Sequence, residues 1–208
     1  MASAAETYNV DVYFDYACPF AWAAQLWLDD VKEELGDKLD MTWRLFPLEQ
    51  ANASDPDFRI WDQPNDGKSS TLRSFQGFHA AKQQGDEAFK KFHAALFRKR
   101  HVDGRNLAGQ AVLESAAEDA GLDMEQFRAD LTSDAVFRQI EEDFSHSQRE
   151  LSVFGTPTIV FENDEGAYLK LNYTDMPTDP VEFFYDFVGT VRDRPSVIEI
   201  KRPQPMGK

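Results

Sequence analysis

The chain has 208 residues, of which 42% are hydrophobic and 13% aromatic, enough apolar material for one folded domain or a domain with an insertion. Its formal net charge of −15 repels phosphate backbones and anionic lipid, so we expect neither nucleic acid nor a membrane as a partner. A single cysteine excludes an intrachain disulfide and a cysteine-rich zinc site. The N-terminal residues show no basic start and no apolar run of signal length, and no stretch approaches the roughly 20 apolar residues of a membrane span. We therefore expect a cytoplasmic protein.

The first 48 residues predict a strand, a helix and a second strand. Residues 8–14 alternate apolar and polar side chains, as a half-buried strand does. Residues 21–35 have helical spacing, and Pro19 suits the first turn of that helix. The residues that can share its apolar face are Trp22, Leu26, Trp27, Val31 and Leu35. Residues 39–48 read as the second strand, and a βαβ unit of this length predicts parallel strands with a right-handed crossover.

The middle of the chain predicts a loop followed by helices. Residues 51–70 are rich in Asn, Asp, Pro, Gly and Ser, a composition typical of loops. Helical stretches follow at 72–84, 86–97, 106–120 and 124–147, the last with a break near Thr132 and Ser133.

The C-terminal part returns to β-structure. The pattern predicts two antiparallel strands, at 153–161 and 167–173, joined by a turn at 163–166. It also predicts a helix at 181–191 and a further short strand at 197–201. The order βαβ, helices, ββα predicts an α/β fold: a thioredoxin-like sheet with an all-helical insertion. We expect the thioredoxin-like domain to comprise residues 1–48 and 150–208, and the loop and helical insertion to comprise residues 49–149.

Cys18 is the candidate catalytic residue. It lies where the first strand turns into the first helix, so unpaired backbone N–H groups and the positive end of the helix dipole favour its thiolate, the nucleophilic form. Pro19 makes the helix start rigid, while Phe20 and Trp22 can form apolar walls of a cleft. The alternative to a functional site is a structural role, in which Cys18 and Trp22 only pack in the hydrophobic core.

Far downstream, Gly155-Thr156-Pro157-Thr158 places a proline at the mouth of the third strand, where proline is tolerated as a first residue. Asp11-Val12-Tyr13-Phe14-Asp15 followed by Cys18-Pro19, with this segment beyond a helical block, resembles the DsbA-like branch of the thioredoxin superfamily. The chain is most similar to FrnE-type and mycothiol-dependent nitroreductase-like proteins. It resembles more distantly the kappa-class glutathione transferases and 2-hydroxychromene-2-carboxylate isomerases.

The resemblance implies that Cys18 is the catalytic, attacking thiol. Pro157 would be a cis-proline facing it, and the backbone of Thr156 would pair with an extended substrate or a thiol cofactor. Pro19, Phe20 and Trp22 complete the expected substrate-binding set. The chain departs from the family at Ala21, which replaces the second cysteine of the Cys-x-x-Cys motif.

The leading hypothesis is therefore a thiol-disulfide oxidoreductase that works with one cysteine. Its mixed disulfide would be resolved by a small thiol such as glutathione or mycothiol. Its partners would be small thiols or disulfides, an aromatic electrophile being a further option, and a homodimer is compatible with the resemblance. One alternative is a kappa-type transferase or isomerase in which Cys18 activates a cofactor thiol. Another is a binding protein without redox activity.

The remaining candidates are weaker. His79, His93, His101 and His146 are scattered without ligand spacing, so we expect no metal site, and a surface position is the simplest prediction for His79 and His101. The basic run 98–101 suits a solvated helix end. Its alternative role is to anchor the carboxylates of a small thiol, with Arg44, Arg59 and Arg73 as further candidates.

Overall fold

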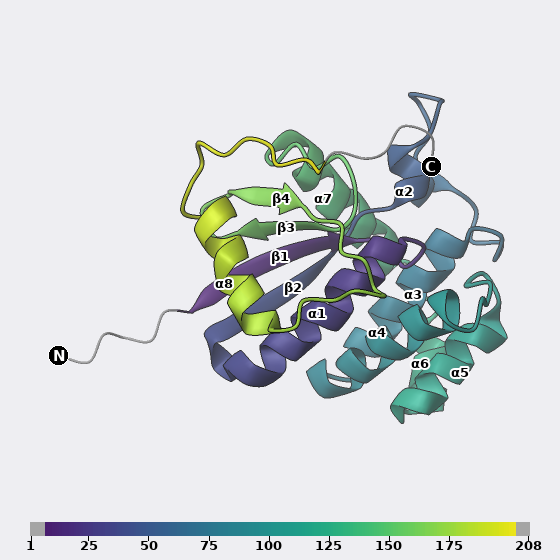
Figure 1. Cartoon of the computed structure of the whole chain (residues 1–208). Helices are drawn as coiled ribbons and strands as arrows, with labels where there is room; N and C mark the ends of the chain where they lie inside the picture. The colour runs from purple at the N-terminus through teal and green to yellow at the C-terminus, as the bar shows by residue number, and fades with distance from the viewer. Residues whose placement is uncertain (1–6, 203–208) are drawn as a thin grey trace.

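A computed structural model describes residues 7–202 of the chain (Figure 1). Within these residues four strands form one mixed sheet in the order β2-β1-β3-β4. The strands are β1 (Tyr8–Phe14), β2 (Leu39–Leu45), β3 (Thr158–Phe161) and β4 (Gly166–Tyr168). The pair β1 and β2 is parallel, with Tyr8 opposite Leu39 and Phe14 opposite Leu45. The pairs β1–β3 and β3–β4 are antiparallel.

The helices fall into a pair that flanks the sheet in sequence and a block between β2 and β3. The flanking helices are α1 (Pro19–Leu35) and α8 (Pro180–Val191). The block contains α2 (Leu48–Ala51), α3 (Ser70–Lys82), α4 (Asp86–His101), α5 (Gln110–Ala120), α6 (Met124–Asp130) and α7 (Ala135–Arg149). Two 3₁₀ turns complete the elements, η1 (Gly36–Lys38) and η2 (Ile60–Asp62). The predicted α/β class with a thioredoxin-like sheet and an intervening helical segment is confirmed.

The sheet is covered on both faces. Figure 1 shows α1 and α8 side by side in front of the strands and α7 behind them, with α3 to α6 gathered beside the end of the sheet where α1 begins. None of the helices in residues 7–202 combines the length and the hydropathy that crossing a bilayer requires.

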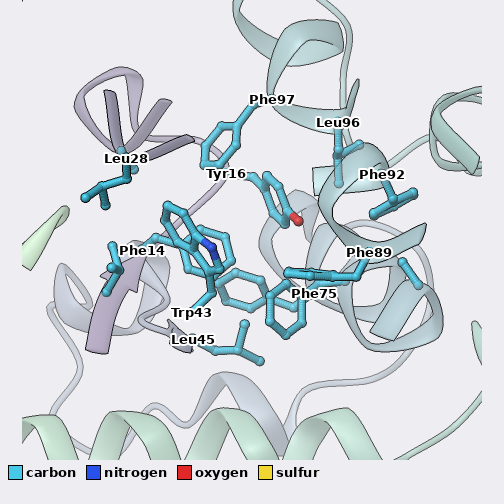
Figure 2. Close-up of a cluster of buried hydrophobic side chains, with 14 of the residues drawn as sticks. Phe14, Tyr16, Leu28, Trp43, Leu45, Phe75, Phe89, Phe92, Leu96 and Phe97 are labelled. Carbon is cyan, nitrogen blue, oxygen red and sulfur yellow. The ribbon is translucent and has the colours of Figure 1, made fainter. Parts of the chain in front are cut away.

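The core at the junction of the sheet and the helical block is built from aromatic rings (Figure 2). Phe14, at the end of β1, lies edge-on to Tyr16 at a centroid distance of 5.0 Å and to Trp43 at 5.3 Å. Tyr16 also packs on Phe97 of α4 at 4.7 Å. The segment that leads into Cys18 is therefore fixed by packing on both sides, because such rings bury large apolar areas and pair in preferred geometries.

The structure corrects several details of the sequence prediction. β2 ends at Leu45 rather than at residue 48, and α5 begins at Gln110 rather than at residue 106. Leu26 is 37% exposed and is not part of the apolar face of α1, which Leu28 joins instead. β3 begins only at Thr158, β4 ends at Tyr168, and residues 197–201 form no strand. The break near Thr132 is present, since α6 ends at Asp130 and α7 begins at Ala135.

The shorter strands have a physical cause. A strand extends only while a neighbour offers paired backbone groups. Beyond Tyr168 the chain leaves the sheet, and the Leu169 amide donates to the Pro157 carbonyl at 3.1 Å instead of continuing the ladder. In the C-terminal segment Ile198 is 95% exposed, so its alternating pattern has no sheet to join among the described residues.

Candidate functional site

Cys18 is the N-cap residue of α1. Its backbone is extended, with φ −83° and ψ 117°, and Pro19 occupies the first helical position. The Cys18 amide donates to the Asp15 carbonyl at 3.0 Å, and the Trp22 amide donates to the Cys18 carbonyl at 3.2 Å. Cys18 thus lies at the positive end of the α1 dipole, and the first turn holds no acidic side chain, although the sulfur makes no capping hydrogen bond to the helix N–H groups.

The Cys18 sulfur faces the Gly-Thr-Pro segment, as the resemblance implies. The Sγ atom donates to the Thr156 carbonyl at 3.2 Å, and the Thr156–Pro157 peptide bond is cis. Cys18 is only 6% exposed and Thr156 2%. The contact suits the thiol form, because a carbonyl oxygen accepts a proton and repels an anion. A reaction partner therefore has to reach a shielded sulfur and displace this hydrogen bond.

Thr156 also carries an unused polar group. Its hydroxyl is buried and has no hydrogen-bond partner among residues 7–202. A buried hydroxyl without a partner costs free energy, so it is a group that a bound ligand or water can satisfy.

Asp15 anchors the loop that carries Cys18. Its carboxylate accepts from the Ala17 amide and from the Leu48 amide at the start of α2, both at 2.8 Å. Burial raises the pKa of Asp15 to about 6, and neighbouring Glu49 raises it further, while the two backbone hydrogen bonds and Arg100 oppose the shift. The strand-to-helix turn therefore contains a carboxyl group that titrates close to neutral pH.

Two histidines of α4 hold Tyr16, the residue after Asp15. The His93 ring Nδ1 lies 2.7 Å from the Tyr16 hydroxyl, and the His101 Nε2 atom donates to the Tyr16 carbonyl at 2.9 Å. Burial lowers the pKa of both histidines, that of His93 strongly, so both rings are neutral at pH 7. His101 is half-buried rather than at the predicted surface position, and its ring supports the loop that carries Cys18.

Aromatic side chains surround the loop. The Trp22 ring stacks on His101 at a centroid distance of 5.3 Å and also packs on Tyr173 at 5.1 Å. The Lys170 ammonium lies 4.9 Å from the Phe20 ring and 5.2 Å from the Tyr168 ring. Phe154 is 75% exposed and packs on Tyr168. The loop therefore has an apolar rim, with Phe154 and Tyr173 open to solvent.

The structure brings only some of the predicted site residues into contact with Cys18. Cys18 touches Thr156, the following Pro157 is buried, and Pro19 is exposed on the surface. The Trp22 ring stacks on His101. Ala21, at the place of a second cysteine, is fully buried.

The proposed arginine anchors are occupied elsewhere. Arg44 pairs with Asp11 at 3.0 Å and lies 3.6 Å from Asp143. Arg59 donates to the carbonyls of its own loop, and Arg73 donates to Gln76 within α3. Within residues 7–202 there is also no group of three or more His, Cys, Asp or Glu side chains arranged to hold a metal ion.

Sequence reasoning missed Asp15, Tyr16, Tyr173, Phe154 and Lys170. Asp15 and Tyr16 are adjacent to the Cys18 motif, which is a signal that could have found them. The other three are separated from Cys18 by most of the chain, and only the fold brings their segments to one rim.

A thioredoxin-like sheet with a helix-capping cysteine opposite a cis-proline segment defines a thioredoxin-fold protein with a thiol site. The model of the DSBA-like thioredoxin domain matches residues 9–188, and the chain belongs to that family. The match runs from the second residue of β1 to the last turn of α8.

Relatives with sequence similarity include an uncharacterized protein of Mycobacterium tuberculosis, which is 24% identical over 94% of this chain and 82% of its own length. The ClpXP adapter protein SpxH of Bacillus subtilis is 29% identical over 57% of this chain and 40% of its own length. The chain thus spans less than half of that relative.

Solved structures support the fold. A thioredoxin-like oxidoreductase from Silicibacter pomeroyi superposes with a TM-score of 0.62 at 20% identity, covering 94% of this chain and 91% of its own. A 2-hydroxychromene-2-carboxylate isomerase superposes with a TM-score of 0.62 at 18% identity, covering 91% of this chain and 98% of its own. Oxidoreductases and an isomerase therefore share this fold, and the fold does not choose between their activities.

Proposed function

We propose that the protein is a DsbA-like thiol-disulfide oxidoreductase that acts through the single nucleophile Cys18 and uses a low-molecular-weight thiol, such as glutathione or mycothiol, as cosubstrate. The observation that carries this proposal is the position of the Cys18 sulfur, at the N-terminus of α1 and 3.2 Å from the carbonyl that precedes cis-Pro157. The apolar rim would favour a substrate with apolar or aromatic groups next to its disulfide.

The chemistry is two successive exchanges. The Cys18 thiolate attacks one sulfur of a disulfide, forms a mixed disulfide and releases the other half as a thiolate, which takes up a proton. A small thiolate then attacks the substrate sulfur of the mixed disulfide and releases Cys18. No electrons are gained or lost overall, because the small thiol replaces the released half in the product disulfide. Ala21 makes the external thiol necessary, since the chain has no second cysteine.

The test is intact-mass analysis of the folded protein after incubation with oxidised glutathione. We expect one glutathione adduct, absent in Cys18→Ser, and its removal by reduced glutathione. If the folded protein acquires no adduct while a urea-denatured sample does, the thiol is unreactive in the fold and the proposal fails.

A second candidate is a binding protein without redox activity. The 6% exposure of Cys18 and the buried Ala21 favour it, and one relative bears the name of a ClpXP adapter protein. This candidate predicts that iodoacetamide leaves Cys18 unmodified in the folded state. A kappa-type transferase or isomerase predicts a third pattern, in which Cys18→Ser keeps turnover because a hydroxyl can also donate a hydrogen bond to a cofactor thiolate.

A further inference from the structure

We infer that the groove between α1 and α4 is a binding site for an acidic peptide segment, separate from the Cys18 site. The groove has a volume of about 750 Å³, within the range of ligand sites in proteins. It is lined by Gln25 and Leu26 of α1, by one face of α4 and by Asp119 of α5. Figure 1 shows α1 and α4 side by side, with α5 beyond α4.

Gln25 is the polar group that the groove leaves without a partner. It is 1% exposed, and its Nε2 atom donates to the Asp29 carboxylate, which fixes the orientation of the amide. Its Oε1 atom is buried and has no hydrogen-bond partner among residues 7–202. A buried acceptor of this kind needs an N–H or O–H donor, and a peptide backbone supplies N–H groups.

The groove is cationic in a strongly acidic protein. Lys91 and Arg98 line it, and no carboxylate pairs with either within the described part of the chain. Lys99 is already paired with Asp119 at 2.8 Å, which leaves Asp103 as the unpaired carboxylate of the lining. In a chain with a net charge of −15, two cations without a carboxylate partner in one groove favour an anionic segment there.

Apolar side chains complete the surface. Leu26 is 37% and Val102 57% exposed, and Ala94 and Ala95 also line the groove, between Lys91 and Arg98 along α4. From Lys91 to Val102 the lining face of α4 spans about 16 Å at 1.5 Å per residue, the length of about five extended residues. The unpaired Gln25 acceptor, the two cations and the apolar side chains together match a short peptide that alternates carboxylate and apolar side chains. Trp22 forms the end of the groove that is one helical turn from Cys18.

The test uses a fluorescein-labelled peptide Leu-Glu-Leu-Glu-Leu-Glu-Leu and fluorescence anisotropy, with a Gln-for-Glu peptide as its neutral counterpart. All measurements use a Cys18→Ser background, so that thiol exchange contributes nothing and the outcome is independent of the proposed function. We expect the acidic peptide to bind, the neutral peptide to bind at least tenfold more weakly, and binding to weaken with salt.

Variants locate the binding. Lys91→Glu with Arg98→Glu should weaken binding by about tenfold or more, and Gln25→Leu by severalfold. Arg138→Glu with Arg149→Glu is the matched control, because it makes the same charge change on exposed positions of α7 and should alter binding less than twofold. Circular dichroism of each variant verifies that it is folded.

The proposal is overturned if both double variants weaken binding equally, since net charge alone would then explain it. It is also overturned if the neutral peptide binds as well as the acidic one, if neither peptide binds, or if millimolar glutathione displaces the peptide. The last result would assign the groove to a small carboxylate-bearing thiol instead.

Discussion

Replacing Asp15 by Asn removes the buried carboxylate that ties the loop before Cys18 to α2, and we expect it to change how the stability depends on pH. The pKa of Asp15 is raised from 3.8 to about 6, chiefly by burial. A raised pKa means that the folded protein holds the proton more tightly than the unfolded chain. The contribution of Asp15 to stability is therefore full below about pH 4 and is lost as the pH rises through about 6.

The size of the effect follows from the shift. At 1.36 kcal/mol per pKa unit the full loss is about 3 kcal/mol, of which about 2 kcal/mol falls between pH 4 and pH 7.5. Asp15 is 1% exposed, so solvent screening reduces this little. The Asn amide offers one acceptor oxygen to the two amides that Asp15 now satisfies, and the unpaired N–H costs about 1–3 kcal/mol at every pH.

Asp15→Asn is thus expected to be clearly less stable than the natural protein at pH 4, and this gap should shrink by about 2 kcal/mol at pH 7.5. Urea unfolding followed by tryptophan fluorescence measures both values. Asp123→Asn is the matched control, because Asp123 also accepts from two backbone amides but in an exposed position. Parallel pH curves for Asp15→Asn and the natural protein would refute the reasoning.

Three further variants test other parts of the site and the sheet. Ala21→Cys supplies a second thiol three residues after Cys18. We expect oxidised glutathione to convert this variant to an internal disulfide, about 2 Da lighter and without a lasting adduct. A stable glutathione adduct would contradict this, and Ala21→Ser is the control. His101→Leu removes the donor to the Tyr16 carbonyl, which should cost about 1 kcal/mol and speed iodoacetamide modification of Cys18; an unchanged rate would show that His101 does not hold the loop closed. Gly166→Ala would place a methyl group 2.8 Å from both the Ile159 carbonyl oxygen and Val160 Cγ2, so we expect a loss of about 1–3 kcal/mol in urea unfolding, and an unchanged midpoint would mean that β4 shifts freely.

Local pattern was sufficient for elements whose partners are close in sequence. β1 and β2 pair along their whole length through the α1 crossover, and β1 has its predicted bounds. α4 runs on from Phe97 to His101, because the basic residues at its end are compatible with a helix C-terminus. β3 and β4 are shorter than predicted, since their extent depends on a neighbour and on the cis segment at Pro157 rather than on composition.

The site was predictable only where it is continuous in the chain. The strand end, Cys18 and Pro19 are adjacent, so their relation follows from the helix start alone. The position of Thr156 against the sulfur came from the resemblance and not from the residues. The support of Tyr16 by two histidines has no pattern in the sequence, because His93 and His101 lie on one helix whose orientation the packing decides.

Because Cys18 is buried and hydrogen-bonded to Thr156, a substrate has to displace the same contact both to reach the sulfur and to react with it. The Cys18 thiol donates to the Thr156 carbonyl, so a reacting disulfide has to displace that contact. A substrate chain that contacts the Thr156 backbone would open the sulfur at the same moment at which it brings its own disulfide near. The closed geometry would then slow the reaction of the only cysteine with small oxidants, and a partner bound at the apolar rim of Phe20, Phe154 and Tyr173 would speed it. On this argument the 6% exposure of Cys18 is compatible with a reactive thiol, provided that the segment around Thr156 yields to a bound partner.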